Sequence, residues 1–185
     1  NQMAAGLPSR SLAKTFIYAF IYGGGDFLVG LLISDENDSK EKITANGRKI
    51  KKAFLKGMPA LDWLIKSVMA KAKAGYINGL DGRRIPTRSA HSALNFLLQS
   101  CGAILSKRWV VIFHDMLKEE GFVDGEDYKQ VAYVHDEVQV LVRPNNAERI
   151  GEICLEAMVR AGEYYNVRMP ITGEYKIGQH WKDTH

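Results

Sequence analysis

The sequence predicts an α+β protein in which helices dominate the first half and an antiparallel hairpin lies in the second half. Three observations support this prediction. Residues 10–22 show helical periodicity between clear end signals, residues 90–120 form a long apolar-periodic segment, and two short β-rich runs within 131–142 are separated by two residues. We therefore expect two consecutive parts, a helical one over residues 1–90 and a mixed one over residues 91–185.

The helical part contains three expected helices. The first begins after Ser9, a favourable N-cap residue, and ends at Gly23–Gly25. A short basic helix is expected over residues 47–57, after a polar loop. Another begins at Pro59 and ends at Gly75, because proline favours the first helical position and glycine commonly follows the last one.

The remaining elements are expected in the following order. Asn-Gly and Asp-Gly pairs within residues 78–82 are hairpin signals. After the long helix, two strands are expected over residues 131–134 and 137–142. A further helix over residues 146–165 and a short terminal strand over residues 169–177 complete the chain.

Composition sets broad limits on function. The chain has 185 residues, of which 46% are hydrophobic and 25% charged, as in ordinary soluble domains. Its net charge of +4 suits a polyanionic partner but is a weak indication by itself. Cys101 and Cys154 form no CxxC pattern, so we expect reduced thiols in the cytoplasm. No signal peptide is visible, and the apolar run FLVGLLI is far shorter than the ~20 residues that span a bilayer, so no membrane partner is expected.

A stripe of four residues lies along the first expected helix. Arg10, Lys14, Tyr18 and Tyr22 step by four, so they share one slanting face. They form either an ordinary solvated face or a nucleotide site. In the second case, the two cations would bind a triphosphate, and the tyrosine rings would lie against a sugar and base.

A second row of polar residues follows the same spacing on the long helix. His91, Asn95 and Gln99 either satisfy a partly buried helix face or contact DNA. Side-chain amides arranged along one line can follow a minor groove, where every base pair presents N3 and O2 acceptors.

Three ionisable residues interrupt the apolar hairpin. His135 and Asp136 are expected at the two-residue turn, with Glu137 directly after them. A carboxylate held at a hairpin tip suits Mg²⁺, although aspartate also favours turns for purely local reasons. The similar pair His114–Asp115 lies in the long helix and is interpreted as a solvated or capping pair.

Together these motifs resemble a family A DNA polymerase, and its bacteriophage T7-like branch in particular. RSLAKTFIYAFIYG looks like motif B, GLDGRR…RSAHSALNFLLQS is similar to the segment that joins fingers and palm, and VHDEVQV looks like motif C. The resemblance covers the whole chain. It implies a fingers subdomain over residues 1–90 and the C-terminal part of a palm subdomain over residues 91–185, with the catalytic Asp on the antiparallel hairpin.

The resemblance also implies roles for the nucleotide stripe. Arg10 and Lys14 would bind the triphosphate of the incoming deoxynucleotide, and Lys14 would act catalytically by stabilising charge on the leaving pyrophosphate. Tyr18 would pack on the sugar and base, where a tyrosine favours acceptance of dideoxynucleotides. Tyr22 would occupy the templating position.

Further roles fall on the hairpin and the long helix. Asp136 would bind catalytic Mg²⁺, and Glu137 would assist as a weaker or indirect ligand. Contacts to primer-template DNA are implied for four residues: His91, Asn95, Gln99 and His135.

One departure from the family pattern stands out. Such polymerases hold two Mg²⁺ ions about 3.5–4 Å apart with two aspartates, the first of which belongs to motif A, upstream of motif B. Because the sequence begins at Asn1, close to motif B, we expect a C-terminal fragment or subunit of a DNA-directed DNA polymerase. Its partners would be primer-template DNA, deoxynucleoside triphosphates and an upstream part with motif A and the thumb, in the same or another chain, in the cytoplasm of a bacterium or phage-infected cell.

Three alternatives differ in class. A single-subunit RNA polymerase typically has Ser after His-Asp, so Glu137 favours DNA polymerase. An HD-type metal phosphohydrolase would need further His and Asp ligands on helices. A non-catalytic DNA-binding module derived from a polymerase would account for the missing aspartate.

Overall fold

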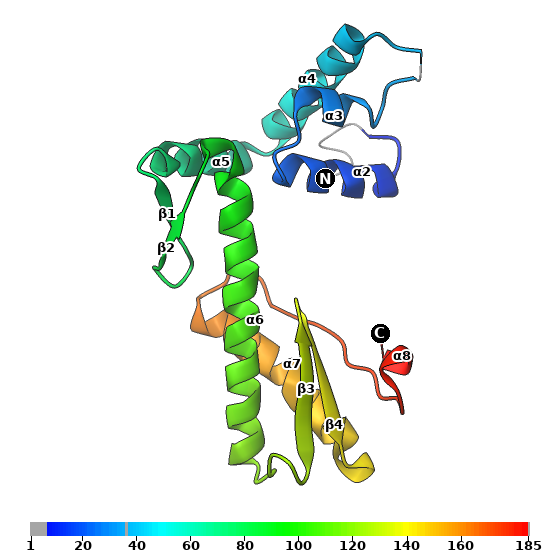
Figure 1. Ribbon diagram of the computed structural model, residues 1–185, viewed down its shortest axis with the longest axis vertical. Coiled ribbons are helices and arrows are strands. Elements are labelled where there is room, and N and C mark those ends of the chain that lie inside the picture. The colour runs from blue at the N-terminus through cyan, green and yellow to red at the C-terminus, as the bar shows by residue number, and fades with distance from the viewer. Residues whose placement is uncertain (1–6, 36, 185) are drawn as a thin grey trace. The chain divides into compact units, whose positions relative to one another are not determined.

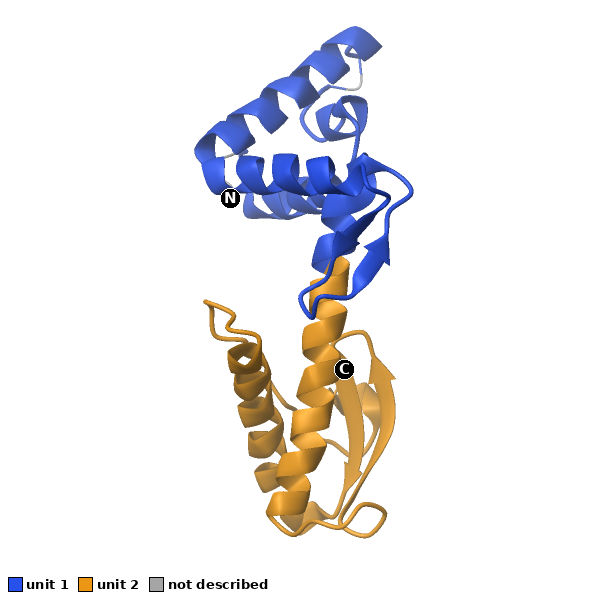
Figure 2. Cartoon of the chain, turned by 90° about the vertical axis from the view of Figure 1, so that its left-hand side faces the viewer, with its two compact units in different colours: residues 1–98 blue, residues 99–185 orange. Residues whose placement is uncertain are grey.

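The computed structural model describes residues 7–35 and 37–184 and confirms the α+β class. The chain divides into two compact units, residues 1–98 and 99–185 (Figure 2). The first unit contains the following elements (Figure 1): α2 (Arg10–Ile21), α3 (Asp26–Gly30), α4 (Lys40–Gly57), α5 (Pro59–Ala72), β1 (Tyr76–Asn78), β2 (Arg84–Pro86), η1 (Ala90–Ser92) and the start of α6 (Ala93–Glu119). The second unit contains the rest of α6 and the following elements: β3 (Tyr128–Val134), β4 (Glu137–Val142), η2 (Pro144–Asn146), α7 (Ala147–Tyr164) and α8 (Trp181–Thr184).

Helix α2 has the predicted ends. The Ser9 side chain accepts a hydrogen bond from the Leu12 amide at 3.1 Å, which satisfies one free donor of the first turn. Beyond the helix, Gly23 adopts a positive φ of 78°, a conformation that glycine reaches without a steric penalty. Phe16 is fully buried and packs edge-on against Phe54 of α4 at 5.1 Å between ring centroids.

Helix α4 begins at Lys40, so its predicted start at residue 47 was wrong. Ser39 provides the N-cap, because its side chain accepts a hydrogen bond from the Lys42 amide at 3.3 Å. Ile43, Ile50 and Phe54 form the buried side of the helix at helical spacing. The charged residues of the first two turns face solvent and had suggested a loop.

The short helix α3, which was not predicted, packs closely against α4. A Cβ atom on Gly47 would collide with the Asp26 carbonyl oxygen, and one on Gly30 would collide with the Ile43 carbonyl oxygen. Two ion pairs strengthen this packing: Asp26 lies 3.2 Å from Nε of Arg48 and 3.1 Å from Nζ of Lys51. The α3–α4 pair therefore depends on backbone-to-backbone proximity.

The first hairpin joins β1 and β2 in antiparallel register, with Tyr76 opposite Pro86. Both predicted turn signals lie in the single loop that connects these strands. Its base belongs to a small core with Val68 and Ala72 of α5, Ile77 of β1 and Ala93 of α6.

The second unit is built around the β3–β4 hairpin, which packs with α6 and α7. Val134 pairs with Glu137 across the turn, and the register shifts between Gln130 and Ala132 in a β-bulge. The core of this unit includes Phe113 and Leu117 of α6 and Ile153 of α7, each fully buried.

The terminal strand predicted over residues 169–177 was wrong. These residues carry no strand pairing and run instead over α7. The ring of Tyr175 occupies the space beside Gly151, Ile171 lies beside Gly162, and the Tyr175 hydroxyl donates a hydrogen bond to Glu148 at 2.8 Å. Small residues on α7 thus leave room for this segment, and no strand of the described residues pairs with it.

Residues 90–119, which include α6, are long and apolar enough to cross a membrane by length and composition, because an 18-residue window within them has a mean hydropathy of 1.3. Of that window 17% is buried, and α6 carries core residues such as Trp109 and Phe113. One such helix is a weak indication, so the absence of a membrane partner stays a prediction.

Candidate functional site

The tip of the β3–β4 hairpin presents His135 and Asp136 as its two turn residues, both exposed. His135 has a φ of 56°, which is uncommon for any residue other than glycine and costs roughly 1–2 kcal/mol. In the described part of the chain, the Asp136 carboxylate has no hydrogen-bond or ion-pair partner. It is therefore available to a ligand and is held in place by two paired strands.

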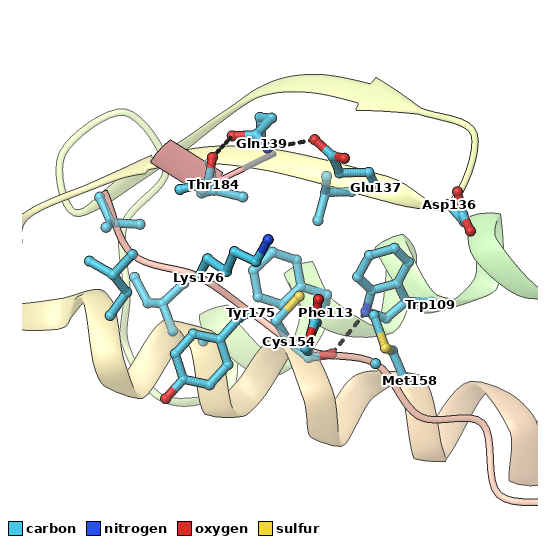
Figure 3. Close-up of a pocket in the computed structure, with 18 of the residues that line it drawn as sticks. Trp109, Phe113, Asp136, Glu137, Gln139, Cys154, Met158, Tyr175, Lys176 and Thr184 are labelled. Atoms are coloured by element: carbon cyan, nitrogen blue, oxygen red, sulfur yellow. Dashed lines mark hydrogen bonds between the residues drawn. The ribbon is translucent and has the colours of Figure 1, made fainter. Parts of the chain in front are cut away.

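Glu137 differs from its neighbour because its carboxylate is already engaged. Its Oε1 accepts hydrogen bonds from Nε2 of Gln139 at 2.6 Å and from Nε1 of Trp181 at 3.2 Å. Gln139 in turn accepts a hydrogen bond from the Thr184 hydroxyl at 3.2 Å (Figure 3). Glu137 thus connects α8 to β4, a contact that the sequence did not predict. Its role as a weaker or indirect metal ligand stays a prediction.

A cavity of about 750 Å³ lies beside β4 in the second unit. Aromatic and aliphatic side chains form much of its wall, among them Trp109, Phe113 and Met158, while Asp136 and Glu137 stand at the hairpin end (Figure 3). Burial raises the pKa of the Cys154 thiol in this wall to about 12, so this side chain is a neutral thiol at pH 7.

The nucleotide stripe lies on the exposed side of α2, opposite the buried Phe16. Arg10, Lys14 and Tyr18 are exposed on the helix, and Tyr22 follows at its C-cap. The two tyrosines are 54% and 57% exposed, which is high for large aromatic side chains. Both cations and both rings are therefore accessible to a ligand from solution.

The polar row on the long helix is divided by the structure. His91 lies in η1, whereas Asn95 and Gln99 lie on α6, so the three residues do not share one continuous α-helix. The Oδ1 atom of Asn95 is buried and has no hydrogen-bond partner among the described residues. An unpaired buried acceptor destabilises the folded state by about 1–3 kcal/mol, and such destabilising groups are found at functional sites.

The structure brings His91 close to the end of α2 within the first unit. A small cavity of about 160 Å³ is lined by both segments and by α4 and α5: its wall includes Phe20, Gly23, Gly24, Lys51, Met69 and His91. The end of α2 and the start of the polar row therefore share one hollow, which the sequence did not predict.

His114 was interpreted as solvated or capping, and this was wrong. Its Nδ1 lies 3.2 Å from the Tyr128 hydroxyl and its Nε2 lies 2.8 Å from Oε1 of Gln130. The imidazole therefore joins α6 to the strand that precedes the hairpin tip. Tyr128 and Gln130 alternate along β3 and therefore lie on the same face of the strand, which brings both to the imidazole.

The described residues contain no group of three or more His, Cys, Asp or Glu side chains placed to hold a metal ion. Asp136 thus supplies a single unengaged carboxylate at the hairpin tip. A hard divalent cation prefers several oxygen ligands, so Asp136 would fit such an ion only as one ligand among others.

A solved structure shares the fold. The structure superposes on the POL domain of Pol1 from M. smegmatis, solved in complex with DNA primer-template and dNTP, with a TM-score of 0.70. That match covers 86% of this chain and 30% of the other at 19% sequence identity, and so concerns the fold alone.

Sequence comparison shows the family. Residues 4–183 match the family model described as DNA polymerase family A, and the chain belongs to that family. It is 39% identical to the DNA-directed DNA polymerase of Enterobacteria phage T3 and 38% identical to that of Escherichia phage T7, in each case over 100% of this chain. The chain spans 28% of the length of these relatives. The resemblance drawn from the three motifs is confirmed.

Proposed function

We propose that the chain supplies the nucleotide-binding side chains and one metal-binding carboxylate of a DNA-directed DNA polymerase. The observation that carries this proposal is the unpaired Asp136 carboxylate at the tip of a paired hairpin, in a chain that belongs to family A. The reaction would be template-directed nucleotidyl transfer, in which positioning and charge stabilisation do most of the catalytic work.

The exposed side of α2 would bind the incoming deoxynucleoside triphosphate. Arg10 and Lys14 place two cations one turn apart, which suits a ligand with several negative charges. Lys14 would also meet the charge that develops on the leaving pyrophosphate. Tyr18 offers an aromatic face and a hydroxyl to the sugar and base, and Tyr22 would stand at the templating position.

Primer-template DNA would contact the polar row and the hairpin. Asn95 would reach minor-groove N3 and O2 acceptors through its Nδ2 donor, whereas its buried Oδ1 has no partner among the described residues. His91 and Gln99 would extend the row, and His135 would support the primer terminus from the turn beside Asp136.

A divalent cation, most simply Mg²⁺, would bind at Asp136 with triphosphate oxygens. Such ions, used as a pair, stabilise the attacking and leaving oxygens of the transfer. Because Gln139 and Trp181 already engage Glu137, we assign the second metal-binding carboxylate to polymerase sequence outside these 185 residues.

The cavity beside β4 is a suitable place for that additional segment. Among the described residues β4 pairs only with β3, so its other edge offers free backbone donors and acceptors. Val138 and Val140 line the cavity along this strand. A strand added here would satisfy the edge, cover the apolar wall and end beside Asp136.

The direct test is Asp136→Asn in the polymerase that contains this chain. We expect the single-turnover rate of incorporation to fall by about 10²–10³-fold or more, while affinity for primer-template DNA stays unchanged, since phosphate contacts dominate affinity. Asp115→Asn, an exposed carboxylate of α6, is the matched control and should leave both quantities unchanged. If Asp136→Asn keeps most of the single-turnover rate of incorporation, Asp136 serves only to form the turn.

A non-catalytic DNA-binding module is the second candidate, favoured by the single unengaged carboxylate. It predicts salt-dependent DNA binding with no metal-dependent incorporation, even after the chain is joined to the remaining polymerase sequence. The same assay therefore decides between the two candidates.

A further inference from the structure

Positive charge is concentrated in a part of the first unit that the proposed active site leaves unused. Residues 40–73, which span α4 and α5, contain ten Lys or Arg and two acidic residues, a net charge of +8 against +4 for the whole chain. The rest of the chain is therefore net negative. Such an asymmetry marks a candidate surface for a polyanion.

Three lysines of α4 form one exposed row. Lys49, Lys52 and Lys56 are spaced by three and four residues, so they share a face and follow one another by about 4.5 and 6 Å along the axis. This face lies opposite the buried side of α4. In the described part of the chain none of the three has an ion-pair partner, whereas Arg48 and Lys51 bind Asp26.

A large aromatic side chain follows the row closely in sequence. Trp63 of α5 is 70% exposed, although indole is among the side chains that gain most from burial. Val68 and Ala72 provide the buried contacts of α5, so the core does not require this tryptophan. Lys66 stands one turn beyond it and pairs with Asp62 at 2.5 Å.

We propose that single-stranded DNA binds to the exposed lysine row of α4, Lys49, Lys52 and Lys56, and stacks on Trp63 of α5. Lysines attract the phosphates, and an exposed indole stacks on an unpaired base, which a base pair inside a duplex cannot offer. A row of cations alone would suit duplex DNA or an acidic peptide equally well; the tryptophan favours the single strand. The identity of the strand rests on the proposed function, because the unpaired part of a template is the single-stranded DNA that a polymerase meets.

The first experiment uses the 185-residue chain and a fluorescent oligothymidylate of about 16 nucleotides, which is the upper end of the site sizes of single-strand binding modules. Fluorescence anisotropy over a range of salt concentrations gives affinity and its salt dependence. Trp63→Ala should weaken binding by about tenfold or more, and Trp63→Phe should lose less because a ring remains. Circular dichroism and thermal unfolding verify that each variant is folded.

The lysines are tested by the salt dependence of binding. Lys52→Gln/Lys56→Gln should reduce the slope of log affinity against log salt by about 1.4, which is two phosphate contacts on a single strand. Lys107→Gln/Lys118→Gln removes the same charge from two exposed lysines of α6 and should leave the slope unchanged. The proposal would be overturned by equal slopes for the two double variants, or by an affinity that Trp63→Ala leaves unchanged. It would also be overturned if duplex DNA or an acidic peptide bound as tightly and with the same dependence on Trp63.

The second experiment separates this surface from the active site. In the complete polymerase, Trp63→Ala should raise the KM for templates with a long single-stranded overhang but not for those with a one-nucleotide overhang, and kcat should stay unchanged. Asp136→Asn should lower the rate of incorporation by about 10²–10³-fold or more and leave oligothymidylate binding intact. If oligothymidylate binds as predicted but Asp136→Asn remains active, the proposed catalytic role fails and the binding surface stands. Loss of kcat in Trp63→Ala on both templates would overturn the binding proposal.

Discussion

The backbone of His135 determines how Asp136 is presented. A φ of 56° places a non-glycine residue in the left-handed region, and paired strands on both sides hold it there. Conformations of this kind persist where the surrounding structure over-determines them, and they concentrate at functional sites. A glycine would make the same turn without the penalty, so the choice of histidine suggests a task for its side chain.

Replacing His135 with glycine separates these two roles. We expect His135→Gly to change the free energy of unfolding by no more than about 1 kcal/mol, because relieved strain offsets the greater freedom of the unfolded chain. Incorporation by the polymerase should nevertheless fall, since the imidazole near the primer terminus is lost. Asn166→Gly is the control, with a φ of 53° after α7. Equal activity of the two variants would leave His135 no role beyond the turn.

Tyr18 carries the second prediction at this scale. A dideoxynucleotide lacks the 3′-hydroxyl that can donate a hydrogen bond to its own phosphates, and the tyrosine hydroxyl can replace that donor. A hydrogen bond to a charged group contributes about 1.5–3 kcal/mol, so Tyr18→Phe should lower kcat/KM for dideoxynucleotides by roughly tenfold or more. The ring remains, so normal nucleotides should be used almost as before.

The measurement is the ratio of kcat/KM for normal and dideoxynucleotides in both proteins. Tyr22→Phe removes the other exposed phenol of the stripe and should keep the ratio of the parent protein. An unchanged ratio in Tyr18→Phe would show that Tyr18 does not face the sugar.

Exposure of individual residues was easier to predict than their partners. Helical spacing placed Arg10, Lys14 and Tyr18 on the solvent side because a helix repeats locally. The engagement of Glu137 by Trp181 joins residues 44 positions apart, and no local pattern encodes such a contact. His114 was misread for the same reason, since its partners lie on a later strand.

Among the elements, the sequence predicted those with strong end signals and missed those that depend on a neighbour. Ser9 and the glycines after α2 defined that helix, and Pro59 defined the start of α5. The strand expected over residues 169–177 failed because a strand requires a partner edge, which is a tertiary property. Helix α3 is too short to show a period and forms where Gly47 lets it approach α4.

The close approach of α3 and α4 gives a prediction about glycine. Gly47→Ala should destabilise the chain by at least about 2 kcal/mol, because the new Cβ atom would meet the Asp26 carbonyl group and force the helices apart. Gly102→Ala is the matched control within α6, where a Cβ atom would meet nothing within 4 Å, and it should stabilise the helix by up to about 1 kcal/mol. Chemical denaturation gives both values; similar effects would show that α3 and α4 can separate without cost.

The same helix pair should respond to acid. Partial burial acts to raise the pKa of Asp26, but the hydrogen bonds and charges of Lys51 and Arg48 outweigh it and hold the pKa below its usual value of 3.8. A lowered pKa in the folded state means that this carboxylate stabilises the fold above about pH 4 and loses that contribution as the pH falls through the folded pKa.

Asp26→Asn tests this linkage. The variant should be less stable than the parent at pH 7 by on the order of 1 kcal/mol, since partly exposed ion pairs contribute modestly. The difference in unfolding free energy between the two proteins should shrink below pH 4. A difference that stays constant from pH 7 to pH 3 would assign the effect to packing and not to charge.

At the scale of the whole molecule, the order of three motifs predicted the fold class and the family correctly. That success rests on each motif being locally encoded in side-chain type and spacing. Contacts between separate segments are not local: within the first unit, the end of α2 and His91 line one small cavity, and no single stretch of sequence specifies that contact. The open edge of β4 likewise concerns sequence beyond the 28% of its relatives that this chain spans.

The final prediction concerns completion of the site. The purified 185-residue chain should not extend a primer, because Asp136 alone leaves a metal pair without its second carboxylate. Supplying the remaining polymerase sequence, fused or as a separate chain, should restore metal-dependent incorporation.

The added sequence should also raise the unfolding temperature of this chain, because an added strand would fill the cavity of about 750 Å³ and pair with β4. A variant of the added segment with its carboxylate changed to Asn should still raise the unfolding temperature but restore no activity. Incorporation by the isolated chain, after rigorous removal of host polymerase, would show that these 185 residues contain a sufficient active site.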